Sequence, residues 1–305
     1  MEDTTQILAI DVAQAELVAF NGEEFALPNQ KKNIRSMLKR HPGWTLVCEP
    51  TSSYHLELIT MAHEEGLRVC LVNPKEMNNY RECRSFRAKT DRIDAKAIHE
   101  FARRHHEVLR TWQPIPEDLT LLRKLIGKRK AAVDARTRFT QAYGKDDEQC
   151  APVQKALTDL IDDLAVQIAT IAGQYEDYER MLSLSGVGPC SAAALTFVLN
   201  AHDFFDDDAA VAFLGIDLRV RNSGRFKGQR KLSKRGDPVL RYYITLAGFG
   251  LLNCKMARDA RAKLNMRNRK WNEQGVIAAR KVVRTAFALH KTKTTFDPEK
   301  WTWMT

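Results

Sequence analysis

The sequence lacks the patterns that mark secreted, membrane-spanning and zinc-binding chains. Its six cysteines are scattered, none forms a Cys-x-x-Cys pair, and no cysteine–histidine set has zinc-ligand spacing. The N-terminus shows no basic region followed by an apolar run, and no stretch approaches the roughly 18 apolar residues of a membrane span. There is also no internal repeat. These absences predict reduced thiols and a cytoplasmic protein without a membrane anchor.

Positive charge is in excess. The 305 residues include 48 Lys and Arg against 38 Asp and Glu, which gives a net charge of +10. Such an excess favours a polyanionic partner, most simply nucleic acid, although an ordinary basic enzyme would carry the same total. The distribution favours nucleic acid, because nine basic residues and only one acid, Asp237, lie between positions 219 and 241.

Strand-like and helix-like segments alternate over roughly residues 1–105. An apolar run at 6–12 is followed by a second at 17–20, and Asn21-Gly22 is a turn signal typical of hairpins. Further buried strands are predicted at 45–49 and 67–72, and helices at 30–40, 54–65 and 91–104. This alternation predicts an α/β domain.

The rest of the chain has a helical pattern. Pro114 and Pro116 mark a boundary, and the long helical pattern that follows is broken at 144–152, which predicts a helical hairpin or coiled-coil-like connector. The apolar positions of this connector could equally serve dimerisation. We therefore predict an α/β domain over 1–113, a helical connector over 114–183 and a mostly helical domain over 184–305.

Four acids have positions that suit a divalent-metal site. Asp11 lies near the end of the first predicted strand, and Glu49 ends a later one. Asp91 and Asp94 are three residues apart, so a helix presents both on one face. Mg²⁺ and Mn²⁺ prefer oxygen ligands, and two such ions can bind the attacking and leaving oxygens of a phosphodiester. Taken singly, each acid has a structural alternative as a turn or helix-capping residue; taken together, they favour the metal.

A basic, glycine-punctuated segment follows near the C-terminus. A solvated charge run is the alternative, but this density in one loop favours phosphate contacts, which supply affinity rather than sequence choice. The nine residues predicted to bind nucleic acid are Arg219, Arg221, Arg225, Lys227, Arg230, Lys231, Lys234, Arg235 and Arg241.

Five segments together resemble one family, in the same order over about residues 5–290. They are IDVAQAEL, CEPTSSYHLEL, NPKEMNNYRECRSFRAKTDRIDAKAIHEFA, SGVGPCSAAAL and FLGIDLRVRNSGRFKGQRKLSKRGDPVLR. They resemble the DEDD transposases of insertion sequences whose recombinases use a bridge RNA, and the related pilin-gene invertases. The KTDxxDA and SKxGxxxLR patterns are the most specific. One departure is Glu49-Pro50-Thr51-Ser52, where the family usually has Glu-Ala-Thr-Gly.

The resemblance implies a RuvC-like, RNase H-type first domain that binds Mg²⁺ or Mn²⁺, with the acidic quartet on Asp11, Glu49, Asp91 and Asp94. It also implies a nucleophilic serine at Ser223, which would attack a DNA phosphate and leave a covalent phosphoserine link. Residue spacing alone would make Ser223 a surface-turn residue. Ser233 is the rival serine, whereas Tyr242 and Tyr243 lie in an apolar helical run that favours core packing.

The implied partners are donor and target DNA, a noncoding bridge RNA and further copies of this chain in a dimer or tetramer. The SGVGP segment at 185–189 is either a phosphate-binding hairpin or a helix-connecting turn. Basic residues of the connector are plausible RNA contacts: Arg123, Lys124, Lys128, Arg129, Lys130, Arg136 and Arg138.

Three other functions fit parts of the pattern. A DNA invertase of the same fold would need no guide RNA, and a RuvC-like nuclease would cut DNA by hydrolysis. A domesticated, non-catalytic nucleic-acid-binding protein is the third. The presence of all four acids and the serine argues against the last of these.

Overall fold

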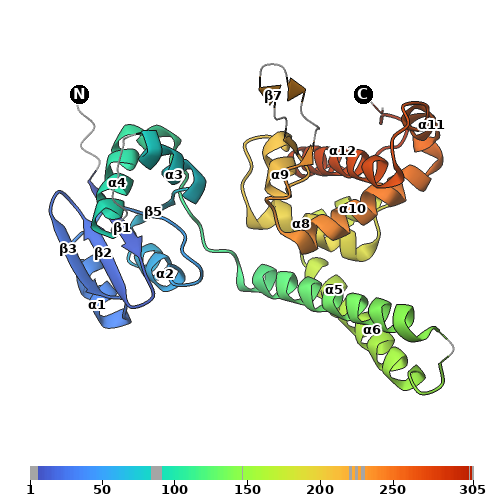
Figure 1. The fold of residues 1–305 in the computed structure, drawn as a ribbon, viewed down its shortest axis with the longest axis horizontal. Helices are drawn as coiled ribbons and strands as arrows, with labels where there is room; N and C mark the ends of the chain where they lie inside the picture. The colour runs from blue at the N-terminus through green and yellow to red at the C-terminus, as the bar shows by residue number, and fades with distance from the viewer. Residues whose placement is uncertain are drawn as a thin grey trace. The chain divides into compact units, whose positions relative to one another are not determined.

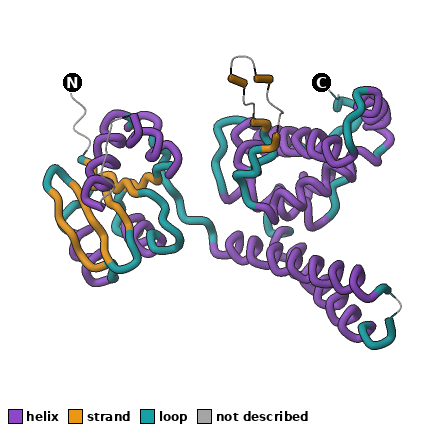
Figure 2. The backbone as a smooth tube through the Cα atoms, viewed as in Figure 1, coloured by secondary structure: helices purple, strands orange, loops and turns teal. Residues whose placement is uncertain are grey.

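The computed structural model describes residues 6–83, 91–145, 147–219, 222–223, 226–227, 231–301 and 303. The chain divides into two compact units, Met1–Pro114 and Ile115–Thr305. Figure 1 labels their helices and strands. Unit 1 mixes strands and helices, whereas unit 2 is mostly helical (Figure 2). The mixed α/β and helical character expected for the two ends of the chain is therefore confirmed.

Unit 1 contains a five-stranded sheet with the strand order β3-β2-β1-β4-β5. Its strands are β1 (Ile7–Val12), β2 (Glu16–Phe20), β3 (Glu24–Pro28), β4 (Thr45–Cys48) and β5 (Arg68–Leu71). The first three form an antiparallel meander, and β4 and β5 continue the sheet parallel to β1. Strand β3 was not predicted, because Leu27 is the only one of its residues that is buried, which leaves no clear alternation.

Alternate residues of the strands pack against two layers of helices. Leu8 and Ile10 point to the layer of α1 (Lys31–Lys39) and α2 (Leu56–Glu64). Ile7 and Ala9 point to the layer of α3 (Pro74–Cys83) and α4 (Asp91–Arg104). This is the period-two alternation of a sheet that is covered on both faces.

The helix α3 was not predicted either. It begins at Pro74, and proline is favoured at the first position of a helix because that position needs no N–H hydrogen bond. An Asn-Pro pair is more typical of turns, which is why the sequence gives little sign of this helix. A short 3-10 helix, His106–Val108, follows α4.

Unit 2 begins with a long antiparallel helical pair, α5 (Glu117–Tyr143) and α6 (Ala151–Ala172), which run side by side in Figure 1. Leu119 and Leu122 of α5 and Ile168 of α6 belong to the same hydrophobic core as the later helices. Those helices are α7 (Glu176–Ser183), α8 (Pro189–Ala201), α9 (Asp207–Phe213), α10 (Pro238–Asn253), α11 (Arg258–Met266) and α12 (Trp271–Thr292), with a 3-10 helix at Lys255–Ala257.

The basic segment of unit 2 contains two short antiparallel ladders between α9 and α10. Strand β6 (Leu218–Arg219) pairs with β9 (Lys231–Leu232), and β7 (Asn222–Ser223) pairs with β8 (Phe226–Lys227). We call residues 218–232 the serine hairpin. Over the parts of the chain that the structure describes, no helix combines the length and the apolar character that crossing a bilayer requires.

Candidate active site

Two of the predicted acids are neighbours at one edge of the sheet. Strands β1 and β4 are parallel, and Ile10 pairs with Cys48. Asp11 is the next residue of β1, and Glu49 directly follows the end of β4. Every second residue of a strand faces the same side of the sheet. Asp11 is therefore on the same side as Ala9, and Glu49 on the same side as Val47, which is the side that α3 and α4 cover. Both positions therefore lie at the carboxyl-terminal edge of the sheet, beneath α3 and α4.

Helix α4 adds a third carboxylate. Its residues Ala97 and Ile98 pack on the sheet against Ile7 and Ala9, and Asp94 lies one turn before them on the same side. The Asp94 side chain is 13% exposed. Asp91 is the first residue of α4, three positions before Asp94; its side chain lies outside the described residues.

Arg81 of α3 connects Glu49 and Asp94. Its Nη2 donates a hydrogen bond of 2.9 Å to Oε2 of Glu49. Its Nε lies 2.8 Å from Oδ1 of Asp94, close enough for an ion pair but without the angle of a hydrogen bond. The Arg81 side chain is 14% exposed. Sequence reasoning missed this residue, although it lies within the NPKEMNNYREC stretch that helps to carry the family resemblance.

The donor atoms at this edge suit a hard divalent cation. Among the residues that the structure describes, no group of three or more His, Cys, Asp or Glu side chains is close enough together to hold an ion. Glu49 and Asp94, which both contact Arg81, offer carboxylate oxygens, the ligands that Mg²⁺ and Mn²⁺ prefer. These two carboxylates both form ion pairs with the guanidinium of Arg81, so this edge of the sheet stabilises positive charge.

The serine hairpin carries the second predicted part of the site. Ser223 lies in β7, where its Cα partner is Phe226. Arg219, Lys227 and Lys231 also lie in the short strands, and only their backbone is described. The remaining predicted residues of the hairpin, Arg221, Arg225 and Arg230, lie outside the described residues.

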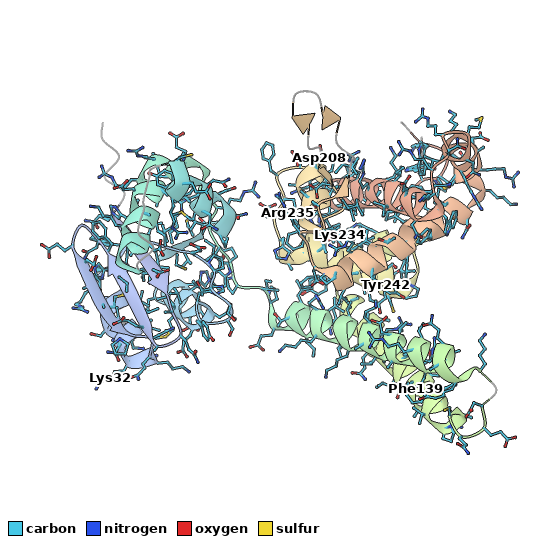
Figure 3. The ribbon with its side chains drawn as sticks, in the orientation of Figure 1. Lys32, Phe139, Asp208, Lys234, Arg235 and Tyr242 are labelled. Atoms are coloured by element: carbon cyan, nitrogen blue, oxygen red, sulfur yellow. The ribbon has the colours of Figure 1, made fainter. Side chains whose placement is uncertain are left out.

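The basic residues after the hairpin have different environments. Lys234 and Arg235 are exposed where the chain leaves β9, and Figure 3 labels both. Arg241 is half-buried, and its Nη1 donates to the carbonyl oxygens of Leu214 at 3.3 Å and Gly236 at 3.0 Å. Arg241 therefore holds the start of α10 against the end of α9.

The two tyrosines of α10 pack inside unit 2, as expected. The Tyr243 side chain is fully buried, and its hydroxyl accepts a hydrogen bond of 3.2 Å from Arg129. Burial raises the pKa of Tyr243, which keeps the hydroxyl protonated and makes it a poor nucleophile. Lys130 lies over the ring of Tyr242, with Nζ 4.3 Å from the ring centre.

Several basic residues of α5 also have partners within the chain. Arg123 forms an ion pair with Asp237, which caps the start of α10. Lys130 pairs with Asp134, and Arg136 donates to Thr158 of α6 at 3.3 Å. Arg123 and Arg136 therefore connect α5 to neighbouring helices, whereas the Lys130–Asp134 pair lies within α5 itself.

Glycine in the SGVGP and SKxGxxxLR patterns has a packing role. Gly186 has a positive φ of 83°, and a Cβ there would overlap the backbone of Gly250 in α10. A Cβ on Gly236 would overlap the carbonyl oxygen of Phe213 in the same way. Because glycine has no side chain, two backbone segments can come into direct contact at each of these positions.

Comparisons with known proteins find similarity to transposases. Residues 4–144 match the DEDD model of IS110-type transposases, and residues 178–263 match the IS116/IS110/IS902 transposase family. A probable family 20 transposase of Pseudomonas aeruginosa is 28% identical over 163 residues. This alignment covers 48% of each chain, so the protein spans about half the length of this curated relative.

The matches first define a class, because both family models describe transposases. More narrowly, both models are of the IS110 type, so the chain is similar to IS110-family transposases over residues 4–144 and 178–263. The matched DEDD domain is consistent with the RuvC-like fold expected for unit 1, and such a domain suggests the use of a divalent metal ion.

Proposed function

We propose that this protein is the transposase of an insertion sequence, a recombinase that cuts DNA and rejoins it to a new partner. The observation that carries the proposal is the convergence of Glu49 and Asp94 beside Asp11 at the carboxyl-terminal edge of the sheet. Carboxylates collected there from two strands and a helix suit metal-assisted phosphodiester chemistry. The matches to transposase models in both units support the same function.

The acidic edge is the proposed metal site. Asp11, Glu49, Asp91 and Asp94 would hold one or two divalent ions, Mg²⁺ or Mn²⁺. Bound there, the metal would act as a Lewis acid toward phosphate oxygens. The contribution of the chain is to gather the acids: the parallel register of β1 and β4 sets Asp11 beside Glu49, and packing of α4 on the sheet brings Asp94 to them.

Ser223 is the proposed nucleophile. Its Oγ would lose its proton and attack the phosphorus of a DNA phosphodiester, and the departing sugar oxygen would take up a proton. The product is a phosphoserine that joins protein to DNA and conserves the phosphodiester bond energy. Attack by the sugar hydroxyl of a second DNA end would then release Ser223 and rejoin the strand without ATP. Resemblance to the family, rather than the position of the side chain, supports this role.

The partners follow from charge and family. The basic residues of the serine hairpin and the exposed pair Lys234 and Arg235 would contact nucleic-acid phosphates. A noncoding bridge RNA would supply sequence specificity by pairing with donor and target DNA. The protein would act as a dimer or tetramer in which Ser223 of one subunit meets the carboxylates of another.

A covalent-adduct assay tests this function. The full chain, purified with its RNA, is mixed with Mg²⁺ and DNA that carries the insertion-sequence end, then denatured. We expect a denaturant-resistant protein–DNA adduct that is lost in Ser223→Ala and kept in Ser233→Ala. It should also be lost in Asp11→Ala and Asp94→Ala. An adduct that persists in Ser223→Ala would place the nucleophile elsewhere, and cleaved DNA without any adduct would favour a simple nuclease.

Sequencing of the copurified RNA separates the two recombinase functions. A single noncoding RNA with segments complementary to donor and target DNA is expected for a guided transposase. An invertase of the same fold would recombine DNA with no such RNA bound.

A further inference from the structure

The ion pairs of Arg81 lie inside the proposed metal site. Arg81 uses Oε2 of Glu49 and Oδ1 of Asp94, atoms of the kind that a divalent ion would also bind. The three side chains are 13–18% exposed, so solvent screens them less than a surface pair. The guanidinium and a divalent ion would therefore act on the same two carboxylates.

Arginine is suited to hold this pair of acids. Two carboxylates brought together repel each other, and a positive group between them removes that cost. The planar guanidinium presents donors in different directions, so one side chain reaches both Glu49 and Asp94. A lysine ammonium, a point charge on a flexible stem, would not hold both acids in one geometry as well.

We propose that Arg81 is a positioning residue that competes with the divalent ion for Glu49 and Asp94. It holds the two carboxylates together when no metal is bound, and it is displaced when an ion takes their oxygens, because guanidinium and ion are both positive. Arg81 thereby lowers the affinity of the site for metal. This inference rests on the proposed metal site at the acidic edge.

Titration with Mn²⁺ tests the competition. The free ion is measured by electron paramagnetic resonance during titration of the full chain, freed of nucleic acid because RNA and DNA bind Mn²⁺ themselves. Arg81→Gln should bind Mn²⁺ more tightly than wild type, on the order of tenfold, the value of one charge-assisted hydrogen bond. Arg81→Lys should show a smaller gain. Arg104→Gln, the same loss of charge at an exposed position of α4, should leave the affinity unchanged.

Stability gives a second readout. Without Mn²⁺, Arg81→Gln should melt at a lower temperature than wild type, because Glu49 and Asp94 then repel each other. With Mn²⁺, the midpoint of this variant should rise by more than that of wild type, since the ion replaces the missing positive charge. A structural role alone would lower the midpoint equally with and without the ion.

The outcomes separate the two proposals. If wild type binds Mn²⁺ and Asp94→Asn weakens that binding, the metal site stands. Equal or weaker binding by both Arg81 variants would then overturn the competition alone. If neither wild type nor any variant binds Mn²⁺, the metal site fails and the competition fails with it. Should Arg81→Gln not fold, as judged by circular dichroism, Arg81→Lys decides by the same comparison.

Discussion

Ser233 and Asp217 are joined twice at the base of the serine hairpin. The Ser233 hydroxyl donates a hydrogen bond to the Asp217 carboxylate, and the Ser233 N–H donates to the Asp217 carbonyl oxygen at 3.0 Å. The two residues flank the paired strands β6 and β9. Ser233 is buried, so this rival serine serves to close the hairpin that carries Ser223.

Ser233→Ala should therefore weaken the hairpin without removing the chemistry. Loss of a buried hydrogen bond to a charged partner should lower the free energy of unfolding by about 1–2 kcal/mol, as measured by chemical denaturation. The protein–DNA adduct should still form, more slowly than in wild type. Ser233→Thr, which keeps the hydroxyl, is the control. Complete loss of the adduct in Ser233→Ala with unchanged stability would instead make Ser233 the nucleophile.

The hairpin charges should control the salt dependence of nucleic-acid binding. Replacing Lys227, Arg230 and Lys231 by glutamine should flatten the plot of log affinity against log salt by roughly 0.7–0.9 for each phosphate that the protein no longer neutralises. Fluorescence anisotropy over a salt series measures the slope. The matched control replaces three exposed basic residues of α1, which packs on the other face of the sheet from the acids: Lys32, Arg35 and Lys39. If the slope changed equally in both triple variants, the effect would come from the net charge of the protein and not from contacts made by the hairpin.

A buried carboxylate in unit 2 should make stability depend on pH. Asp177 is almost fully buried, with His290 Nδ1 at 2.6 Å and Arg180 Nη1 at 2.8 Å. Burial alone would raise the pKa of Asp177, but the hydrogen bonds from His290 and Arg180 outweigh it and lower the pKa to about 2. The ordinary value is 3.8. A lowered pKa stabilises the fold above about pH 4 and loses that effect as pH falls toward 2.

Asp177→Asn tests this linkage. At pH 6 the variant should be less stable than wild type by on the order of 1–2 kcal/mol. The difference should shrink as pH falls from 4 toward 2, because the unfolded wild-type chain then takes up a proton at Asp177 that the folded chain does not bind. Thermal unfolding of both proteins at each pH measures this difference in stability. A difference that stays constant over this range would show that the charge of Asp177 contributes nothing to stability.

The close approach at Gly236 should make that position intolerant of a side chain. In Gly236→Ala the new methyl group would overlap the carbonyl oxygen of Phe213, and the end of α9 would have to move. We expect a loss of about 1–3 kcal/mol in the free energy of unfolding. Gly188→Ala is the matched control, because no atom lies within 4 Å of the position that its methyl group would take and its φ is −84°. That change should cost less than about 1 kcal/mol.

The amino-acid sequence alone determined the strands β1, β2, β4 and β5, most of the helices and the placement of Asp11 and Glu49 at strand ends. These features follow from local periodicity, which needs no knowledge of what packs where. The helix α4 was predicted over the same residues, 91–104, that it occupies in the structure. The spacing of three residues likewise predicted that Asp91 and Asp94 lie on the same face of this helix.

Tertiary structure decided which polar groups meet. Arg81 is 32 residues from Glu49 in sequence, and only packing of α3 and α4 on one face of the sheet brings it between Glu49 and Asp94. The same holds for Asp217 with Ser233, and for Arg241 with the end of α9. Each side chain in these pairs looks like a solvated charge or a turn residue in sequence. Its role depends on elements that are far apart along the chain, and hydrophobic packing of those elements sets the distances between them.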